Sequence, residues 1–170
     1  TVAKDQTFET FRSFVLAPDR EDRERQSMAQ RRMYRTLAPW STENPLMMHV
    51  RSADPDKVRA AIDQCVEVGF EMVILTFGSG FNIEDDSQQN LDLWRDIASY
   101  AHERGIHIGG YSLLSSRRIQ PDTDNCINRE TGKPGGQVFG TAPALASVWG
   151  QDYFKKLYRF YEYTGFDLLE

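Results

Sequence analysis

The most constraining feature of this chain is a junction that occurs three times, a glycine followed at once by an apolar residue and then a polar one. It reads Gly69-Phe-Glu, Gly105-Ile-His and Gly165-Phe-Asp. Each glycine follows a stretch with helical apolar spacing, which is the place where glycine commonly ends a helix. The repeat predicts strands that alternate with helices, and such strands pair in parallel through right-handed crossovers. The fold class is therefore α/β, either a doubly wound sheet or a (β/α)8 TIM barrel.

Between these junctions the pattern predicts four strands, at residues 46–50, 70–76, 106–114 and 166–170. The helix after the first strand begins at Asp54-Pro55, an N-cap followed by a first-turn proline. The next helix is predicted from about 90 to 104, and a last one is marked by Tyr153, Leu157 and Phe160. Residues 41–170 would then form one α/β unit, and this pattern alone leaves both the doubly wound sheet and the barrel open.

The residues before the first strand follow another pattern. Phe11, Phe14, Val15 and Leu16 lie without helical spacing, and the stretch 11–16 predicts a strand of some other layer, within a segment 1–18. Residues 19–40 are rich in arginine and predict a charged connector helix, whose charges are either simply solvated or form an anion-binding face.

Composition disfavours several classes of function. The chain has 20 basic and 25 acidic residues, a net charge of −5, which does not suit a nucleic-acid partner. No run approaches the roughly 20 apolar residues that cross a bilayer, so we expect no membrane partner. Cys65 and Cys126 have no metal-ligand spacing, and Cys65 lies on an apolar helix face where it is expected to be inert. Gly78-Ser-Gly80 lacks the third glycine of a dinucleotide motif, and no cofactor or metal is predicted.

Chemistry is expected at the carboxyl ends of the strands, where α/β folds keep their sites. A loop of roughly 34 residues follows the third strand on that side, and loops of this length are usually functional or disordered. The candidate substrate-binding residues there are His49, Phe77, Glu84, Tyr111, Ser112, Arg117 and Trp149. Structural roles are the alternative for His49, for Glu84 as an acid before a helix, and for Arg117 on the surface.

Aromatic side chains are of interest because sugar rings present apolar C–H faces that stack on them, although core packing is their commoner role. Trp40 and Phe81 belong to this group with Phe77 and Trp149. Gly109-Gly110 inside the third strand suggests close approach of another group. His102 is expected to act as a cation near a helix C-terminus, and His107, at the start of a strand, is discounted as a site residue.

Several stretches resemble bacterial α-galactosidase-like barrels of the melibiase type. They are residues 31–45, 70–80, 109–117 and 149–170, so the resemblance extends over about residues 30–170. It implies that residues 41–170 form the first half of a TIM barrel, with its four strands in sequential parallel order. It also implies a retaining glycoside hydrolase that acts on a carbohydrate, secreted or periplasmic, with a β-sandwich domain before the barrel. Residues 1–18 would then be the end of that sandwich or a linker.

The sequence departs from the family pattern at two places. The family carries Asp-x-x-Lys-x-Asp at the fourth strand, where the last Asp is the nucleophile; here Asp167-Leu-Leu-Glu170 puts a glutamate at the lysine position. Glu170 is thus a candidate substrate-binding residue, and the nucleophile would lie two residues past it, so no catalytic residue is assigned and these 170 residues are expected to be inactive alone. Thr76-Phe77-Gly78 replaces the family's galactose-binding Asp pair. A non-catalytic carbohydrate-binding barrel and a TIM-barrel enzyme of another class are the alternatives.

Overall fold

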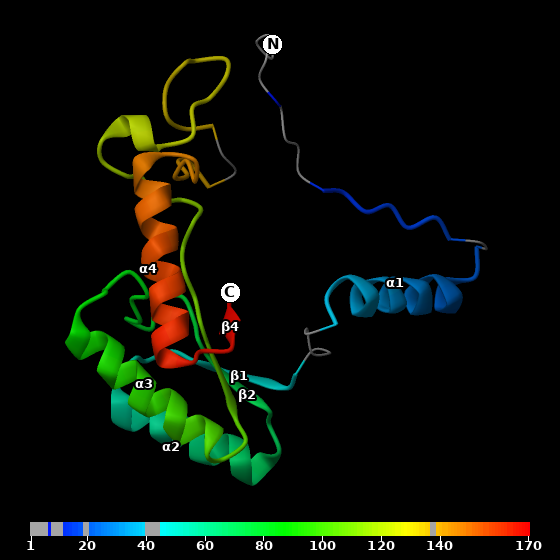
Figure 1. Ribbon diagram of the computed structural model, residues 1–170, viewed down its shortest axis with the longest axis vertical. Helices are drawn as coiled ribbons and strands as arrows, with labels where there is room; N and C mark the ends of the chain where they lie inside the picture. Colours follow the sequence, from blue (N-terminus) through cyan, green and yellow to red (C-terminus); the bar gives the residue numbers. More distant parts are fainter. Residues whose placement is uncertain (1–6, 8–11, 19–20, 40–44, 137–138) are drawn as a thin grey trace. The chain divides into compact units, whose positions relative to one another are not determined.

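The structure is a computed structural model that describes residues 7, 12–18, 21–39, 45–136 and 139–170. The chain divides into two units, Thr1–Asn44 and Pro45–Glu170 (Figure 1). In the first unit, helix α1 spans Arg23–Leu37, and the N-cap Asp22 accepts a hydrogen bond from the Arg25 N–H at 2.9 Å. The helix predicted within 19–40 is therefore present.

The strand predicted at 11–16 is not found in the described residues. Residues 12–18 run without assigned secondary structure, and Phe11 lies outside the described part of the chain. An apolar run becomes a strand only when a neighbouring strand satisfies its backbone groups, and the described residues of this unit supply none. The apolar residues of this stretch could not indicate whether a neighbouring strand lies beside it.

The second unit is built on a four-stranded parallel sheet. Its strands are β1 Met47–Val50, β2 Met72–Leu75, β3 His107–Gly110 and β4 Leu168–Leu169. They lie in the order β1-β2-β3-β4, and each pairs in parallel with the next. A doubly wound sheet reverses its strand order at a switch point, whereas a TIM barrel keeps sequential order. The prediction of an α/β fold with the first four strands of a TIM barrel is confirmed.

Three helices follow the strands, and local sequence explains their ends. Helices α2 Pro55–Val68, α3 Gln88–His102 and α4 Val148–Thr164 begin after the N-caps Asp54, Ser87 and Ser147, whose side chains each accept a backbone N–H. Gly69 and Gly165 end α2 and α4 in the left-handed conformation, with φ of 78° and 76°. Helix α3 begins and ends two residues earlier than predicted, and Gly105, with φ of 72°, lies in the turn to β3. Within the described residues, no helix combines the length and apolarity needed to span a membrane.

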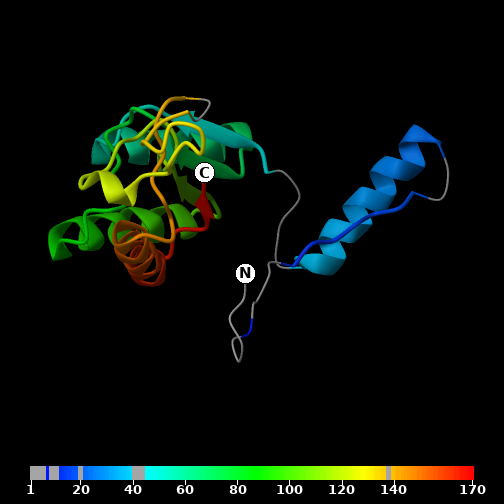
Figure 2. The same ribbon diagram turned by 90° about the horizontal axis from the view of Figure 1, so that it is seen from above.

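The helices pack on one face of the sheet, and α3 lies beside α4 (Figure 2). Val73 and Leu75 of β2 and Ile108 of β3 belong to this core. The ring of Phe81 lies in it too, stacked on Phe166 with ring centroids 5.6 Å apart. A Cβ atom at position 110 would come within 2.3 Å of the Phe81 ring, so glycine at this position lets the ring reach the sheet. Phe81 thus packs in the core, and the close approach suggested by the paired glycines is present at Gly110.

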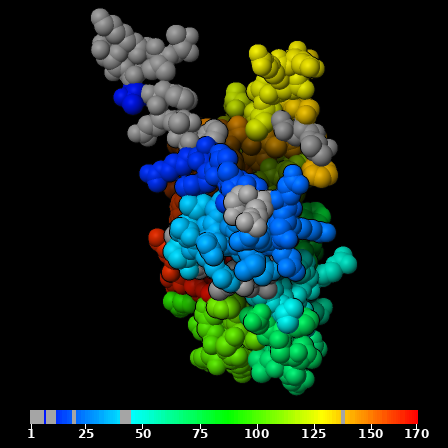
Figure 3. All heavy atoms as spheres, turned by 90° about the vertical axis from the view of Figure 1, so that its right-hand side faces the viewer, coloured from blue at the N-terminus to red at the C-terminus, as the bar shows by residue number. Residues whose placement is uncertain are grey.

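A long connection follows β3, which ends at Gly110 rather than at the predicted 114 because β2, its partner, ends at Leu75. The connection contains the short 3-10 helix Asp122–Asp124 and two isolated antiparallel bridges. Its organising residue is Asn125, which is 2% exposed and bonds both backbone groups of Ile119 through its side-chain amide, each at 2.7 Å. The described part of this loop, yellow to orange, lies at the opposite end of the unit from α2 (Figures 1 and 3).

Candidate functional site

The candidate site lies where the strands end. Backbone hydrogen bonds continue the ladder one residue past the strands: Tyr111 N–H to Leu75 C=O at 3.0 Å, and Glu170 N–H to Gly110 C=O at 2.9 Å. The Ser112 N–H in turn bonds the Glu170 C=O at 3.1 Å. Three of the predicted residues, Tyr111, Ser112 and Glu170, therefore meet at the carboxyl edge of the sheet.

An aromatic pair occupies this edge. The rings of Phe77 and Tyr111 meet edge to face, with centroids 5.7 Å apart and an interplanar angle of 68°. Phe77 is 63% exposed, so one aromatic surface remains open beside the strand ends. The turn that positions Phe77 contains Gly78 with a φ of 77°, a conformation that glycine adopts without a steric penalty.

Tyr111 and Glu170 share the sheet face away from the helices. Side chains alternate along a strand, and Ile108 contributes to the helix-side core, so Gly109 and position 111 belong to the opposite face. The register pairs Gly109 with Leu168, which sets Glu170 beside Tyr111 on that same face. In a closed barrel this is the face that lines the interior.

A second group of predicted residues comes together beside α4. The Arg117 guanidinium makes a bidentate ion pair with Glu84, with Nη2 to Oε2 at 3.0 Å and a second, shorter contact between Nη1 and Oε1. The same guanidinium lies 5.2 Å from the centre of a ring of Trp149. The hydrogen bonds to Glu84 raise the pKa of Arg117 above its usual value. We call Glu84, Arg117 and Trp149 the loop cluster, because it joins the β2–α3 connection to the β3–α4 connection.

Tyr153 of α4 links the loop cluster to the strand end. Its ring stacks on Trp149, with centroids 5.1 Å apart and planes at 22°. Its hydroxyl is hydrogen-bonded to Ser112 Oγ at 2.8 Å, and burial raises its pKa. Sequence reasoning used Tyr153 only as a marker of the buried helix face. A buried tyrosine hydroxyl normally needs a polar partner. A tyrosine on the buried helix face therefore indicates that a polar group lies nearby, although it does not identify Ser112.

The remaining predicted residue, His49, is exposed on β1. It shares a register row with Ile74 of β2, and so belongs to the same sheet row as Gly109 and Leu168. Among the described residues, no hydrogen bond or ion pair joins its side chain to the aromatic pair or to the loop cluster. Trp40 lies outside the described residues.

The two other histidines meet one carboxylate at the amino end of the sheet. Asp167 lies 2.9 Å from His102 Nε2 through Oδ2 and 3.3 Å from His107 Nδ1 through Oδ1. Its Oδ2 also accepts the Ile108 N–H at 2.8 Å. The expectation for His102 is thus incomplete, because its partner is a side chain as well as the helix end. This carboxylate lies at the end of the strands opposite to Phe77, where conserved structure in TIM barrels serves stability.

Other chemistry finds little support in the described residues. No group of three or more His, Cys, Asp or Glu side chains is placed there to hold a metal ion. Cys65 is fully buried, and burial raises the pKa of its thiol, which supports the expectation that it is unreactive. The carboxyl edge instead offers an open aromatic surface, a carboxylate and hydroxyl groups, which are the groups that bind a sugar ring and its hydroxyls.

Comparison with known proteins finds similarity at the level of structure. No protein-family model matches the chain, and no curated protein matches it. Among solved structures, a noncanonic maltogenic α-amylase from Thermotoga neapolitana superposes with a TM-score of 0.48 and 12% sequence identity, over 72% of this chain. The matched region is 37% of the amylase chain. The fold is established by the strand order and register of the sheet. The chain spans little more than a third of the length of the amylase.

Proposed function

We propose that this chain is the first half of a glycoside hydrolase barrel of the α-galactosidase type and that its carboxyl edge binds a carbohydrate. The observation that carries the proposal is the Phe77–Tyr111 pair, with Glu170 beside Tyr111 on the sheet face away from the helices. An exposed ring can stack on the apolar face of a sugar, while a carboxylate and a phenol bond its hydroxyls. Such a mixture of a few polar groups with aromatic surface is typical of small-ligand sites.

The chemistry proposed for the whole enzyme is retaining hydrolysis. One carboxylate attacks the anomeric carbon, and a second protonates the leaving oxygen and then activates water, with the two groups about 5–5.5 Å apart. By the family resemblance, the nucleophile follows Glu170 by two residues at the end of β4. Glu170 replaces a lysine of that family, so it would accept hydrogen bonds from sugar hydroxyls where the lysine would donate them.

The loop cluster has a positioning role in this proposal. Glu84 and Arg117 satisfy each other, with side chains 20% and 32% exposed. Their contact holds the β3–α4 loop beside the β2–α3 connection, so that the loop borders the sugar site. Trp149, whose rings lie against Arg117 on one side and Tyr153 on another, is fixed in place by the same contacts.

A non-catalytic carbohydrate-binding barrel is the second candidate. The observation that favours it is the pair of departures from the family pattern, Glu170 and Thr76-Phe77-Gly78. Both alter groups that the resembling enzymes use at the sugar, and the second of them supplies the exposed ring of Phe77. An extended chain that includes the residues after Glu170 separates the candidates: hydrolysis of an aryl α-galactoside favours the enzyme, and binding without turnover favours the binder.

Sugar binding by the chain tests the shared part of both candidates. We expect α-galactosides or other oligosaccharides on a sugar array to bind, and the double variant Phe77→Ala/Tyr111→Ala to bind about tenfold more weakly, because each stacked ring contributes roughly 0.5–1.5 kcal/mol. Tyr158→Ala is the matched control, since Tyr158 is 65% exposed on α4 away from the strand ends. Binding that is equal in both variants would refute the proposed site, and turnover by these 170 residues would refute the assignment of the nucleophile beyond Glu170.

A further inference from the structure

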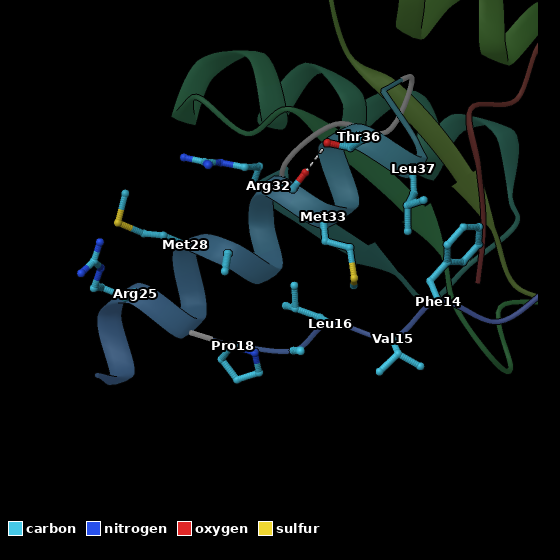
Figure 4. Close-up of a pocket in the computed structure, with 12 residues that line it drawn as sticks. Phe14, Val15, Leu16, Pro18, Arg25, Met28, Arg32, Met33, Thr36 and Leu37 are labelled. Carbon is cyan, nitrogen blue, oxygen red and sulfur yellow. Dashed lines mark hydrogen bonds between the residues drawn. The ribbon is translucent and has the colours of Figure 1, made fainter. Parts of the chain in front are cut away.

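The first unit contains an apolar groove of about 580 Å³ between residues 14–18 and α1. Figure 4 shows Met33 and Leu37 on the side of the helix that faces the extended segment with Phe14 and Leu16. The helix side of the groove repeats every three to four residues: Arg25, Met28, Ala29, Arg32, Met33, Thr36 and Leu37. This spacing is that of a helix face built to pack against another element.

The described residues of the unit leave this groove largely uncovered. Helix α1 has no buried residue. Val15 is 91% exposed, Met28 67% and Phe14 61%. Isolated helices of about 15 residues are marginal in water, so most helical stability comes from packing of an apolar face. The groove is therefore a surface that gains stability when a further element lies in it.

Charge indicates what that element carries. Arg25 and Arg32 line the groove seven residues apart, which is about 10 Å along a helix. Among the described residues, neither guanidinium has a carboxylate partner at ion-pair distance. Within α1, Glu24 is the one acidic residue against five arginines. The groove thus combines an apolar floor with two unpaired positive charges.

We propose that this groove binds an acidic amphipathic helix of a partner protein. An apolar stripe on the partner would cover Met33 and Leu16, and two carboxylates two turns apart would pair with Arg25 and Arg32. Binding of a helix through an apolar face with charged flanks is a common recognition mode. A second copy of the same helix fits poorly, because a parallel pairing in register, or an antiparallel one centred on the groove, sets arginine against arginine.

Two synthetic helical peptides of equal length and equal leucine content test the proposal. One carries Glu at positions i and i+7 beside the leucine stripe, and the other carries Lys there. We expect the full chain to bind the Glu peptide at least tenfold more tightly at low salt, measured by fluorescence anisotropy. Arg25→Glu/Arg32→Glu should reverse the preference, and Arg12→Glu/Arg23→Glu, the same charge change at residues outside the groove lining, should keep it.

Circular dichroism establishes that the variants retain their helix content. Three outcomes would overturn the proposal: no preference between the peptides, tighter binding to phosphatidylglycerol vesicles that is lost in the Arg25→Glu/Arg32→Glu variant, or self-association of the chain that this variant abolishes. The first would remove the role of charge, and the others would assign the groove to a lipid surface or to a second copy.

Discussion

At the scale of single residues, two side chains connect elements that are distant in sequence. Asp167 connects β4 to β3 and to the end of α3 through one carboxylate. Tyr153 connects α4 to the end of β3. Neither pairing has a sequence spacing that could reveal it, because each depends on how the helices lie on the sheet. The sequence therefore placed Tyr153 on the right helix and Asp167 one residue outside its observed strand, since β4 begins at Leu168, and it revealed neither partner.

Asp167→Asn tests the first of these connections. The variant keeps one acceptor oxygen but loses the charge shared by the two histidines and the Ile108 N–H. We expect a loss of about 1–2 kcal/mol in the free energy of unfolding, measured by urea denaturation. Asp96→Asn is the control, because the Asp96 side chain is 70% exposed in its pair with Arg59, and such surface pairs contribute little. Equal effects of the two substitutions would contradict the connecting role of Asp167.

At the scale of elements, helix ends were more predictable than strand ends. Asp54, Gly69 and Gly165 act on their own neighbours in the chain, so their positions fixed the beginning of α2 and the ends of α2 and α4. Strand length depends on the neighbouring strand, so β3 stops four residues before its predicted end. The same reason explains why residues 12–18 form no strand.

Gly110→Ala tests the packing of β3 against the helices. The backbone there does not have a positive φ, so alanine is allowed locally, but its Cβ would overlap the ring of Phe81. We expect destabilisation of about 1–3 kcal/mol from overpacking. The double variant Gly110→Ala/Phe81→Leu should recover part of this loss relative to the sum of the single changes, measured by a double-mutant cycle. Strict additivity would show that Phe81 is not the obstacle.

At the scale of the whole molecule, the repeated glycine junctions predicted the α/β class, and the resemblance to α-galactosidase-like barrels implied the sequential strand order that the sheet has. The role of the candidate site residues stays a prediction, and the structure shows how they are grouped. Glu84, Arg117 and Trp149 do come together, but as a cluster whose charges satisfy each other. That mutual pairing depends on the path of the β3–α4 loop, which Asn125 stabilises through side-chain hydrogen bonds to Ile119 within the loop.

The molecule as a whole should lose stability in alkali through its buried tyrosines. Burial raises the pKa of Tyr161 and of Tyr153, and the Tyr161 hydroxyl also donates to the Leu168 C=O. The unfolded tyrosine has a pKa of about 10, so this contribution is complete below pH 10 and is lost progressively as the pH rises further. Urea midpoints from pH 8 to 11 should therefore fall less steeply for Tyr161→Phe than for the exposed control Tyr158→Phe. Identical slopes would contradict this expectation.

Glycine at position 110 also affects the register of β3 against β2. A slip of β3 by two residues against β2 would bring Ile108 or Ser112 to the point where the Phe81 ring approaches the strand. A slip by one residue would bring Gly109 or Tyr111 there and would turn every side chain of the strand to the other face of the sheet. The Phe81 ring therefore disfavours the two-residue slips, and burial of Ile108 on the helix side disfavours the one-residue slips. The alignment in turn determines that the phenol of Tyr111, and no neighbouring side chain, stands next to Phe77.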